Sequence, residues 1–166
     1  MKIALVAMSG IRVCDQELLN MGLTLPGFVE RSKVIASLPS LGLLTLAGMT
    51  PNHHQTRYLE VDDINADGGV SEKLVDFDLI AISSFSAQIK EAYALADDLR
   101  TKGAKVVIGG LHASSLPQEA KQHSDAVIIG EGELSWLDML HDAEEGRLEP
   151  YYTAGRAEFG LQDAPM

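Results

Sequence analysis

The sequence predicts a doubly wound α/β fold built on a parallel sheet, and the clearest evidence lies between residues 78 and 110. Two short apolar runs at 79–82 and 106–108 lack the polar alternation of half-exposed strands, which is typical of parallel strands covered on both faces. Between the two runs, apolar residues recur at helical spacing, at Ile89, Ala92, Ala96 and Leu99. A strand, a helix and a strand of this length predict a right-handed βαβ crossover.

The residues before this unit predict two strands and one helix. Residues 3–8 form an apolar run typical of a first strand, and residues 57–61 form a half-alternating second strand. Between them, Ser40 is a candidate N-cap for a helix over 41–49, which the proline at position 51 ends. Because that helix has almost no polar residues, we expect it to be largely buried.

The residues after this unit continue the alternation of strands and helices. Gly103 is a plausible helix stop, and Ser115 with Pro117 predicts the start of the next helix. Residues 126–129 predict the last strand. A final helix, ended by Gly146, carries apolar residues at Leu134, Leu137 and Leu140.

These elements predict a three-layer, doubly wound sheet of five parallel strands, flavodoxin-like with strand order 2-1-3-4-5. Residues 1–146 are expected to form one domain, and residues 147–166, which lack a clear period, a linker tail. The connection over 11–39 is long but too apolar for a disordered linker, so we expect it to pack over the sheet or a neighbouring domain.

The composition of the chain excludes several classes of binding partner and metal site. The net charge of −11 disfavours binding to nucleic acid or to an anionic membrane surface, and no apolar stretch is long enough to cross a bilayer. The apolar run near the N-terminus is too short for a signal peptide, so a cytoplasmic location is expected. Cys14 is the only cysteine, which excludes an internal disulfide and any all-cysteine metal or iron–sulfur site.

Ligands of open α/β sheets bind at the carboxyl ends of the strands. Two candidate loops follow neighbouring strands there, and they contain Ser83, Ser84, Phe85 and Ser86 in one and Gly109, Gly110, Leu111 and His112 in the other. The serine hydroxyls can bind a ligand, or one of them can cap the next helix. The glycine pair permits close approach of a ligand, or it simply forms a turn.

A third candidate loop follows the last strand and consists of Gly130, Glu131, Gly132 and Glu133. It resembles part of a dinucleotide fingerprint, but its carboxylates would compete with a phosphate for the helix N-terminus, so a pyrophosphate site is not expected. Glu133 is either a ligand contact or an ordinary acid in the first turn of a helix.

The remaining reactive residues do not match a catalytic or metal motif. The five histidines have no metal-ligand spacing, and we expect His53 and His54 to lie in a solvated turn. His112 is the exception because of its place at the carboxyl edge, although it can also be a surface loop residue. There is no nucleophile elbow and no Walker loop, so no catalytic residue is expected on this chain.

Four stretches in order resemble the N-terminal cobalamin-binding domain of B12-dependent radical SAM enzymes. They are PSLGLL at residues 39–44, DLIAIS at 78–83, VIGGLHA at 107–113 and AVIIGEGE at 126–133. The final residues, LQDAPM, also resemble the linker that leads into the radical SAM barrel in this family. The cysteine triad that would hold the [4Fe–4S] cluster of such an enzyme is absent from this chain.

The resemblance implies a cobalamin across the carboxyl ends of the strands. Its nucleotide tail would enter near the serine and double-glycine loops, and the corrin would lie over Ser40, Leu41, Leu111, His112 and the 130–133 loop. The Asp-x-His-x-x-Gly signature of cobalamin-binding proteins is missing after the first strand. Asp63-x-Asn65-x-x-Gly68 resembles it superficially, but it follows the second strand and is not taken as the equivalent. We therefore expect base-off binding without a histidine ligand from the protein.

By this resemblance, the chain is a cobalamin-binding module that catalyses nothing alone. It would act with a radical SAM domain, in cis or in trans, that binds S-adenosylmethionine and the cluster and performs methyl transfer or radical cyclisation. One alternative is a degenerate, cofactor-free domain that serves as a substrate-binding or docking cap. A flavin-binding or response-regulator domain is a weaker alternative, because Ser83 stands where a regulator carries its phosphoacceptor aspartate.

Overall fold

The computed structural model describes residues 1–8, 39–65 and 68–153. They form a sheet of six parallel strands in the order β2-β1-β3-β4-β5-β6. The strands are β1 (Lys2–Met8), β2 (Gln55–Val61), β3 (Leu79–Ser83), β4 (Lys105–Gly109), β5 (Ala126–Ile129) and β6 (Tyr151–Thr153). The helices are α3 (Leu41–Met49), α4 (Val70–Leu74), α5 (Ile89–Thr101), α6 (Leu111–Ser115), α7 (Pro117–Gln122) and α8 (Trp136–Glu144), with short 3₁₀ turns η2 (Ser86–Gln88) and η3 (Gly132–Leu134).

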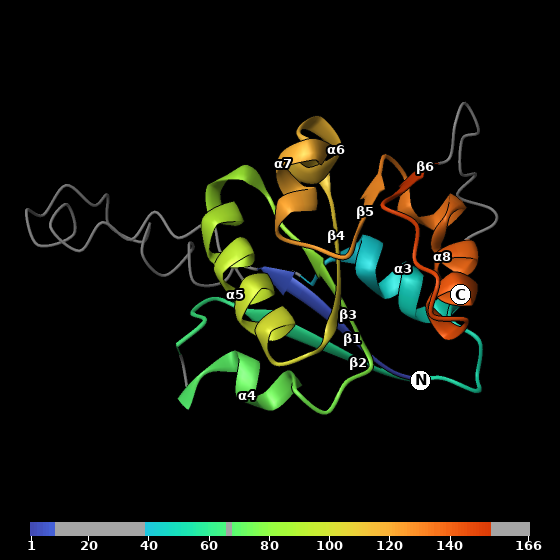
Figure 1. Ribbon diagram of the computed structural model, residues 1–166, viewed down its shortest axis with the longest axis horizontal. Coiled ribbons are helices and arrows are strands. Elements are labelled where there is room, and N and C mark those ends of the chain that lie inside the picture. The colour runs from blue at the N-terminus through green and yellow to red at the C-terminus, as the bar shows by residue number, and fades with distance from the viewer. Residues whose placement is uncertain (9–38, 66–67, 154–166) are drawn as a thin grey trace, which may run out of the picture.

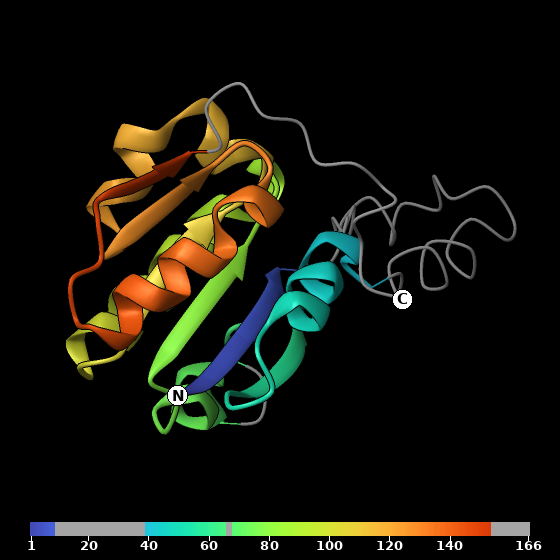
Figure 2. The same ribbon diagram turned by 90° about the vertical axis from the view of Figure 1, so that its right-hand side faces the viewer.

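Helices cover both faces of the sheet, as the doubly wound prediction requires (Figure 1). One face packs against α4, α5, α6 and α7. The other face packs against α3 and α8, which lie over the same side of the strands (Figure 2). The expected three-layer architecture is therefore confirmed.

Strand β1 shows why the sequence folds in this way. Successive side chains of a strand point to opposite faces, so Ile3 and Leu5 join the core under α3 and α8 while Ala4 and Val6 join the core under α4 and α5. All four are fully buried, which explains the unbroken apolar run in the sequence.

The predicted order of the first five strands is confirmed, and the structure adds a sixth. Residues 151–153 lie in the stretch that the sequence analysis assigned to a tail, yet they pair with β5. Tyr152 is buried, and its hydroxyl donates to Asp142 of α8 at 2.9 Å. A three-residue strand is too short to show a period of two, so the sequence carried no pattern to detect.

The predicted Ser40 cap of α3 is confirmed, because its hydroxyl accepts a hydrogen bond from the Leu43 amide at 3.4 Å. The expected burial of this helix is wrong. Leu43 and Leu46 are its only buried residues, whereas Leu41 is 76% exposed and Leu44 is 39% exposed. The helix packs on the sheet by one stripe, and leucines also occupy the face that points away from the sheet.

The region after β4 contains two helices where the sequence predicted a loop and one helix. Pro117 takes the first position of α7 as predicted, but Ser115 does not cap it. Its hydroxyl donates instead to the Leu111 carbonyl, one turn back in α6. Five residues are too few to show helical periodicity, so α6 could not be detected.

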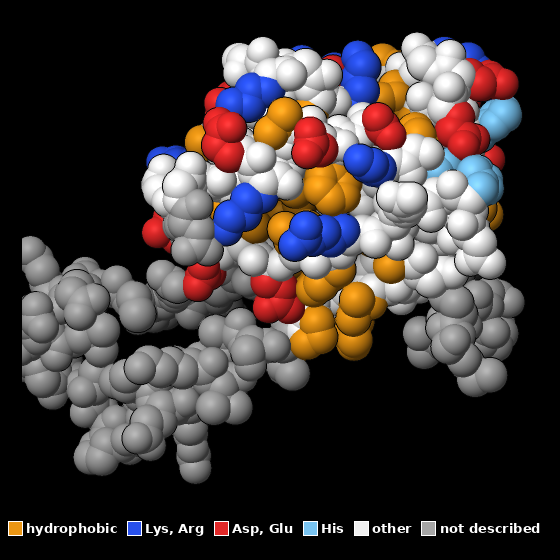
Figure 3. All heavy atoms as spheres, turned by 90° about the horizontal axis from the view of Figure 1, so that it is seen from below, with side chains coloured by type: hydrophobic (Ala, Val, Ile, Leu, Met, Phe, Trp, Pro, Cys, Tyr) orange, Lys and Arg blue, Asp and Glu red, His pale blue; other side chains and the backbone are white. Residues whose placement is uncertain are grey.

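Most of the predicted connection over 11–39 lies outside the described residues, as do residues 154–166. Within the described residues, no helix combines the length and apolar character that a bilayer crossing needs. On the face shown in Figure 3, lysine and arginine side chains lie among acidic and apolar ones and form no continuous basic patch.

Candidate functional site

A pocket of about 170 Å³ lies at the carboxyl edge of the sheet, on the side of α3 and α8. Its apolar walls come from α3, from three central strands and from the start of α8. The apolar side chains are Leu43, Leu46, Ala81, Ile82, Val107, Ile128 and Trp136. Trp136 is fully buried, and its indole nitrogen donates to the Thr50 hydroxyl at 2.9 Å, which fixes the ring against α3.

Glycines set the shape of the pocket. Gly110 has φ +98°, and a Cβ there would lie 3.0 Å from the Ser84 carbonyl oxygen and 3.1 Å from the Ser83 hydroxyl. Only glycine therefore allows the β3 and β4 loops to approach this closely. Gly132 differs, because a Cβ there would make ordinary contacts of 3.6 Å with Leu46 and Ile128, two of the wall residues.

Eight of the residues predicted from the sequence line this pocket. They are Ser40, Ser83, Gly109, Gly110, Gly130, Glu131, Gly132 and Glu133. The other six, Leu41, Ser84, Phe85, Ser86, Leu111 and His112, follow α3's cap or the ends of β3 and β4 but do not line it. The loops that were predicted from three separate motifs therefore meet around one cavity.

Ser40 is held at the N-terminus of α3 by a hydrogen bond to β2. Its amide donates to the Tyr58 hydroxyl of β2 at 2.8 Å, and that hydroxyl donates to Glu60. Burial, followed by the hydrogen bond to Glu60, raises the pKa of Tyr58, while the bond from Ser40 opposes this shift. On the other side, the Gly130 amide donates to Ser114 at 2.9 Å, which ties the 130–133 loop to α6.

Three apolar side chains stand exposed near the pocket. Leu41 is 76% exposed, Phe85 60% and Leu111 69%. Leu41 follows the cap of α3, Leu111 follows the cap of α6, and Phe85 lies two residues after the end of β3. Exposed apolar groups that gather beside a cavity are typical of a binding surface.

The serine loop is held by its own hydrogen bonds rather than by helix capping. Ser84 is buried and donates to the Phe85 carbonyl at 3.0 Å. Neither η2 nor α5 has a side-chain cap, so the capping alternative for these serines is wrong.

His112 lies on α6 with only 12% of its side chain exposed, so it is not a solvated loop residue. Its Nδ1 lies 2.9 Å from the Ser86 hydroxyl, and its Nε2 lies 3.2 Å from Glu119. The hydrogen bond with His112 is the largest influence that holds the pKa of Glu119 below its usual value, and the nearby Tyr93 hydroxyl acts in the same direction. Burial, followed by the Glu119 carboxylate, raises the pKa of Tyr93 to about 12.

The residues that form the pocket walls were not predicted from the sequence. The strand residues Ala81, Val107 and Ile128 were assigned to the core, and nothing in an apolar run tells a wall residue from a core residue. Trp136 offered the one usable signal, because the chain's single tryptophan lies three residues after the end of the 130–133 loop.

The fold and the pocket agree with a comparison of sequences. The family described as "B12 binding domain" matches residues 31–137, well over half of the chain. The chain belongs to the B12-binding domain family, so the resemblance to cobalamin-binding domains is confirmed.

Three similar proteins, each named as a methyltransferase, are much longer than this chain. It is 36% identical to Bacteriochlorophyllide d C-8(2)-methyltransferase of Chlorobaculum tepidum over 116 residues, which are 68% of this chain and 24% of that protein. It is 30% identical to Bacteriochlorophyllide d C-12(1)-methyltransferase of the same organism over 118 residues, which are 71% of this chain and 25% of that protein. An uncharacterized methyltransferase of Pyrococcus horikoshii is 28% identical over 117 residues, 66% of this chain and 26% of that protein. The chain thus matches about a quarter of each relative's length.

Proposed function

We propose that this chain binds cobalamin at the carboxyl edge of its sheet, with the nucleotide tail in the pocket and the corrin over the surrounding loops. The observation that carries the proposal is the position of the pocket. All of its lining residues, from Ser40 to Trp136, fall within the stretch 31–137 that matches the B12-binding family. The 83–86 loop with Gly109 and Gly110 would lie beside the tail, whereas Ser40, Leu41, Leu111, His112 and the 130–133 loop would lie under the corrin.

The residues present fit such a ligand. Apolar walls and glycine backbone suit a flat aromatic ring, and exposed Leu41, Phe85 and Leu111 offer apolar contact to a macrocycle. The carboxylates of Glu131 and Glu133 line the pocket, and they can accept hydrogen bonds from amide groups at a corrin's periphery. The same carboxylates disfavour a nucleotide polyphosphate, so they discriminate between the two ligand classes.

The lower face of the cobalt is proposed to receive no histidine from this chain. All five histidines fall within the described residues, and only His112 follows a strand at the carboxyl edge. Both of its ring nitrogens already have partners, Ser86 and Glu119. Binding would then be base-off without a protein ligand, and nitrogen hyperfine splitting in the EPR spectrum of bound cob(II)alamin would contradict this.

The first experiment tests cobalamin binding directly. The chain is incubated with excess hydroxocobalamin, separated from free cofactor by gel filtration, and examined by absorbance. We expect corrin bands to co-elute with the protein. Gly132→Leu should abolish them because its side chain would occupy space between Leu46 and Ile128, whereas Gly132→Ala, whose Cβ makes only ordinary contacts, should retain most of the bound cofactor.

A colourless wild-type protein would count against the proposal. Equal retention by Gly132→Leu, with its fold verified by circular dichroism, would show that the tail does not use this pocket. Gly132 is preferred to Gly110 for this test, because a side chain at Gly110 would strain the backbone and disturb the fold.

The parent protein is proposed to be a radical SAM methyltransferase in which this chain is the cobalamin module. The support is that the named relatives are methyltransferases of which the chain matches about a quarter. Cobalamin supplies a cobalt centre that carries a methyl group; the residues of this chain bind it, orient it and cover its tail from water. S-adenosylmethionine and a [4Fe–4S] cluster would belong to another domain, because Cys14 alone cannot hold such a cluster.

This part of the proposal is tested on the parent protein, purified without oxygen. We expect iron and sulfide in the amounts of one cluster, cleavage of S-adenosylmethionine after reduction, and methylation that depends on added cobalamin. A parent that lacks iron, or that methylates equally well without cobalamin, would contradict it.

A further inference from the structure

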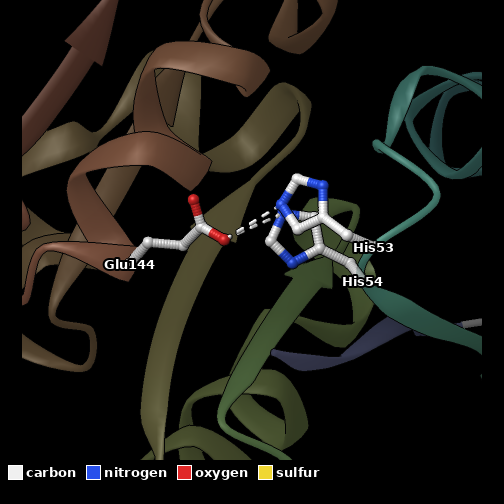
Figure 4. Close-up of side chains that lie close together, drawn as sticks. All are labelled: His53, His54 and Glu144. Carbon is white, nitrogen blue, oxygen red and sulfur yellow. Dashed lines mark hydrogen bonds and ion pairs between the residues drawn. The ribbon is translucent and has the colours of Figure 1, made fainter.

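A second group of ligating side chains lies at the opposite, amino edge of the sheet. His53 and His54 come from the connection between α3 and β2, and Glu144 is the last residue of α8 (Figure 4). The Glu144 Oε1 atom lies 3.1 Å from His53 Nε2 and 3.5 Å from His54 Nε2. Two imidazoles that are adjacent in sequence thus face one carboxylate from a helix 90 residues away.

The local backbone explains how two consecutive histidines point the same way. In an extended chain their side chains would point to opposite faces. Here the His54 amide donates to the Pro51 carbonyl at 3.0 Å, which closes a turn just before β2. The two rings consequently lie 4.1 Å apart between centroids, with an angle of 41° between their planes.

The group is held in place before any ligand arrives. The His54 side chain is only 1% exposed, and its Nδ1 lies 3.3 Å from the Met1 nitrogen, so Nε2 is the nitrogen that faces Glu144. The bond from Trp136 to Thr50 joins the same connection to the start of α8. The sequence prediction of a solvated turn is therefore wrong for His54.

We propose that His53, His54 and Glu144 form a binding site for a divalent transition metal ion, with Zn²⁺ as the preferred ion. Bonds of about 2.0–2.1 Å in a tetrahedral site place ligand atoms roughly 3.3–3.4 Å apart. The two nitrogen–oxygen distances of 3.1 and 3.5 Å bracket this value, and one ligand atom from each residue lies within 4.8 Å of the others.

The donor chemistry selects the metal. Two imidazole nitrogens and one carboxylate oxygen suit zinc, whereas Mg²⁺ and Ca²⁺ prefer oxygen ligands alone. His53 is 64% exposed at its side chain, so water can reach the ion and fill a fourth position. The net charge of −11 also favours the approach of a cation.

The consequence of occupancy is a cross-link between two elements far apart in sequence. The metal would join the α3–β2 connection to the end of α8, on the edge away from the pocket. Because the ion binds the folded chain, it should raise Tm, by roughly 5–10 °C when free zinc exceeds Kd about 100-fold.

The test measures zinc binding by isothermal titration calorimetry, using the 166-residue chain without a histidine tag, in metal-free buffer and without cobalamin. We expect one Zn²⁺ per chain and the rise in Tm. His53→Ala and Glu144→Gln should each weaken binding at least tenfold and remove the Tm shift. Both residues are partly exposed, so these variants should fold, which circular dichroism verifies.

His141→Ala is the matched control. His141 also lies beside a carboxylate, with Nε2 3.4 Å from Glu145 Oε1, but it is not part of the group that can hold a metal. We expect this variant to bind zinc as the wild type does. The proposal is overturned if the wild type binds no zinc, if His53→Ala and Glu144→Gln bind it unchanged, or if His141→Ala weakens binding equally.

Discussion

The carboxyl edge and the amino edge of the sheet differ in the residues that form them. At the carboxyl edge, β3 ends in Ser83 and β4 in Gly109, and a pocket lies between these strand ends and α3. At the amino edge, strand beginnings are closed by side chains: the Lys2 amide donates to Asp78 at 2.7 Å, and the Val106 amide donates to Asp125 at 2.8 Å. Unpaired backbone groups are thus satisfied on one edge, while room for a ligand is kept on the other.

This difference teaches where stability and binding reside. The carboxyl edge has small residues that contribute little packing but permit close approach, whereas the amino edge has hydrogen bonds and ion pairs that fix the register of neighbouring strands. Substitutions at the two edges should therefore have different signatures, and three changes test or sharpen the contrast.

Trp136 should be an exception to the division between a binding edge and a stabilising edge, because it lines the pocket and also donates a hydrogen bond to Thr50. Trp136→Ala is expected to lower the free energy of unfolding by about 4 kcal/mol, since it leaves a large cavity. Trp136→Phe keeps most of the packing and loses the hydrogen bond, for an expected loss of about 1 kcal/mol. Urea unfolding followed by circular dichroism measures both, and a small loss in the alanine variant would show that the pocket region does not contribute to the core.

Gly110 should show how much the close approach of the β3 and β4 loops depends on glycine. Gly110→Ala is expected to cost about 2–3 kcal/mol, because it combines φ +98° with a contact of 3.0 Å to the Ser84 carbonyl. Gly146→Ala is the control, with φ +71° and no atom within 4 Å of the new Cβ, and should cost about 1 kcal/mol. Equal losses in urea unfolding would mean that only the backbone angle matters.

Replacing Glu119 should have the smallest effect on stability of the three changes, and this effect should depend on pH. Its carboxyl pKa is lowered from 4.5 in the folded protein, first by His112 and then by Tyr93. A lowered pKa in the folded state stabilises the fold above 4.5, and this contribution disappears as the pH falls through the folded value. Glu119→Gln should therefore lower the urea midpoint at neutral pH and leave it unchanged well below 4.5.

The control for this prediction is the same substitution in a His112→Ala background. Without the imidazole, most of the pH-dependent difference should vanish. A difference that persists at acidic pH would show that Glu119 acts through packing rather than through its charge.

The sequence was informative where an element had enough residues to show a period. The helix at Ile89–Thr101 and the strand at Ala126–Ile129 were predicted closely, because burial on one or both faces leaves a regular apolar pattern. The loops around the pocket could also be predicted, because strand ends of a parallel sheet meet at one edge.

The rest depends on contacts between distant residues. Leu41 is exposed although its helix is apolar throughout, since the sheet provides only one surface for α3 to cover. Glu144 and Met1 lie beside the buried His54. Both are far from it in the sequence, and only the fold brings them together. A pattern within ten residues contains no information about such neighbours.

The position of β1 in the sheet has a consequence for synthesis on the ribosome. It precedes both of its partners in the sequence, since it lies between β2 and β3, which begin at Gln55 and Leu79. The nascent β1 therefore emerges long before either partner exists, with six consecutive residues that are buried in the folded protein. We expect slow formation of the sheet and a need for protection from aggregation during translation, the cost of placing the earliest strand in the interior.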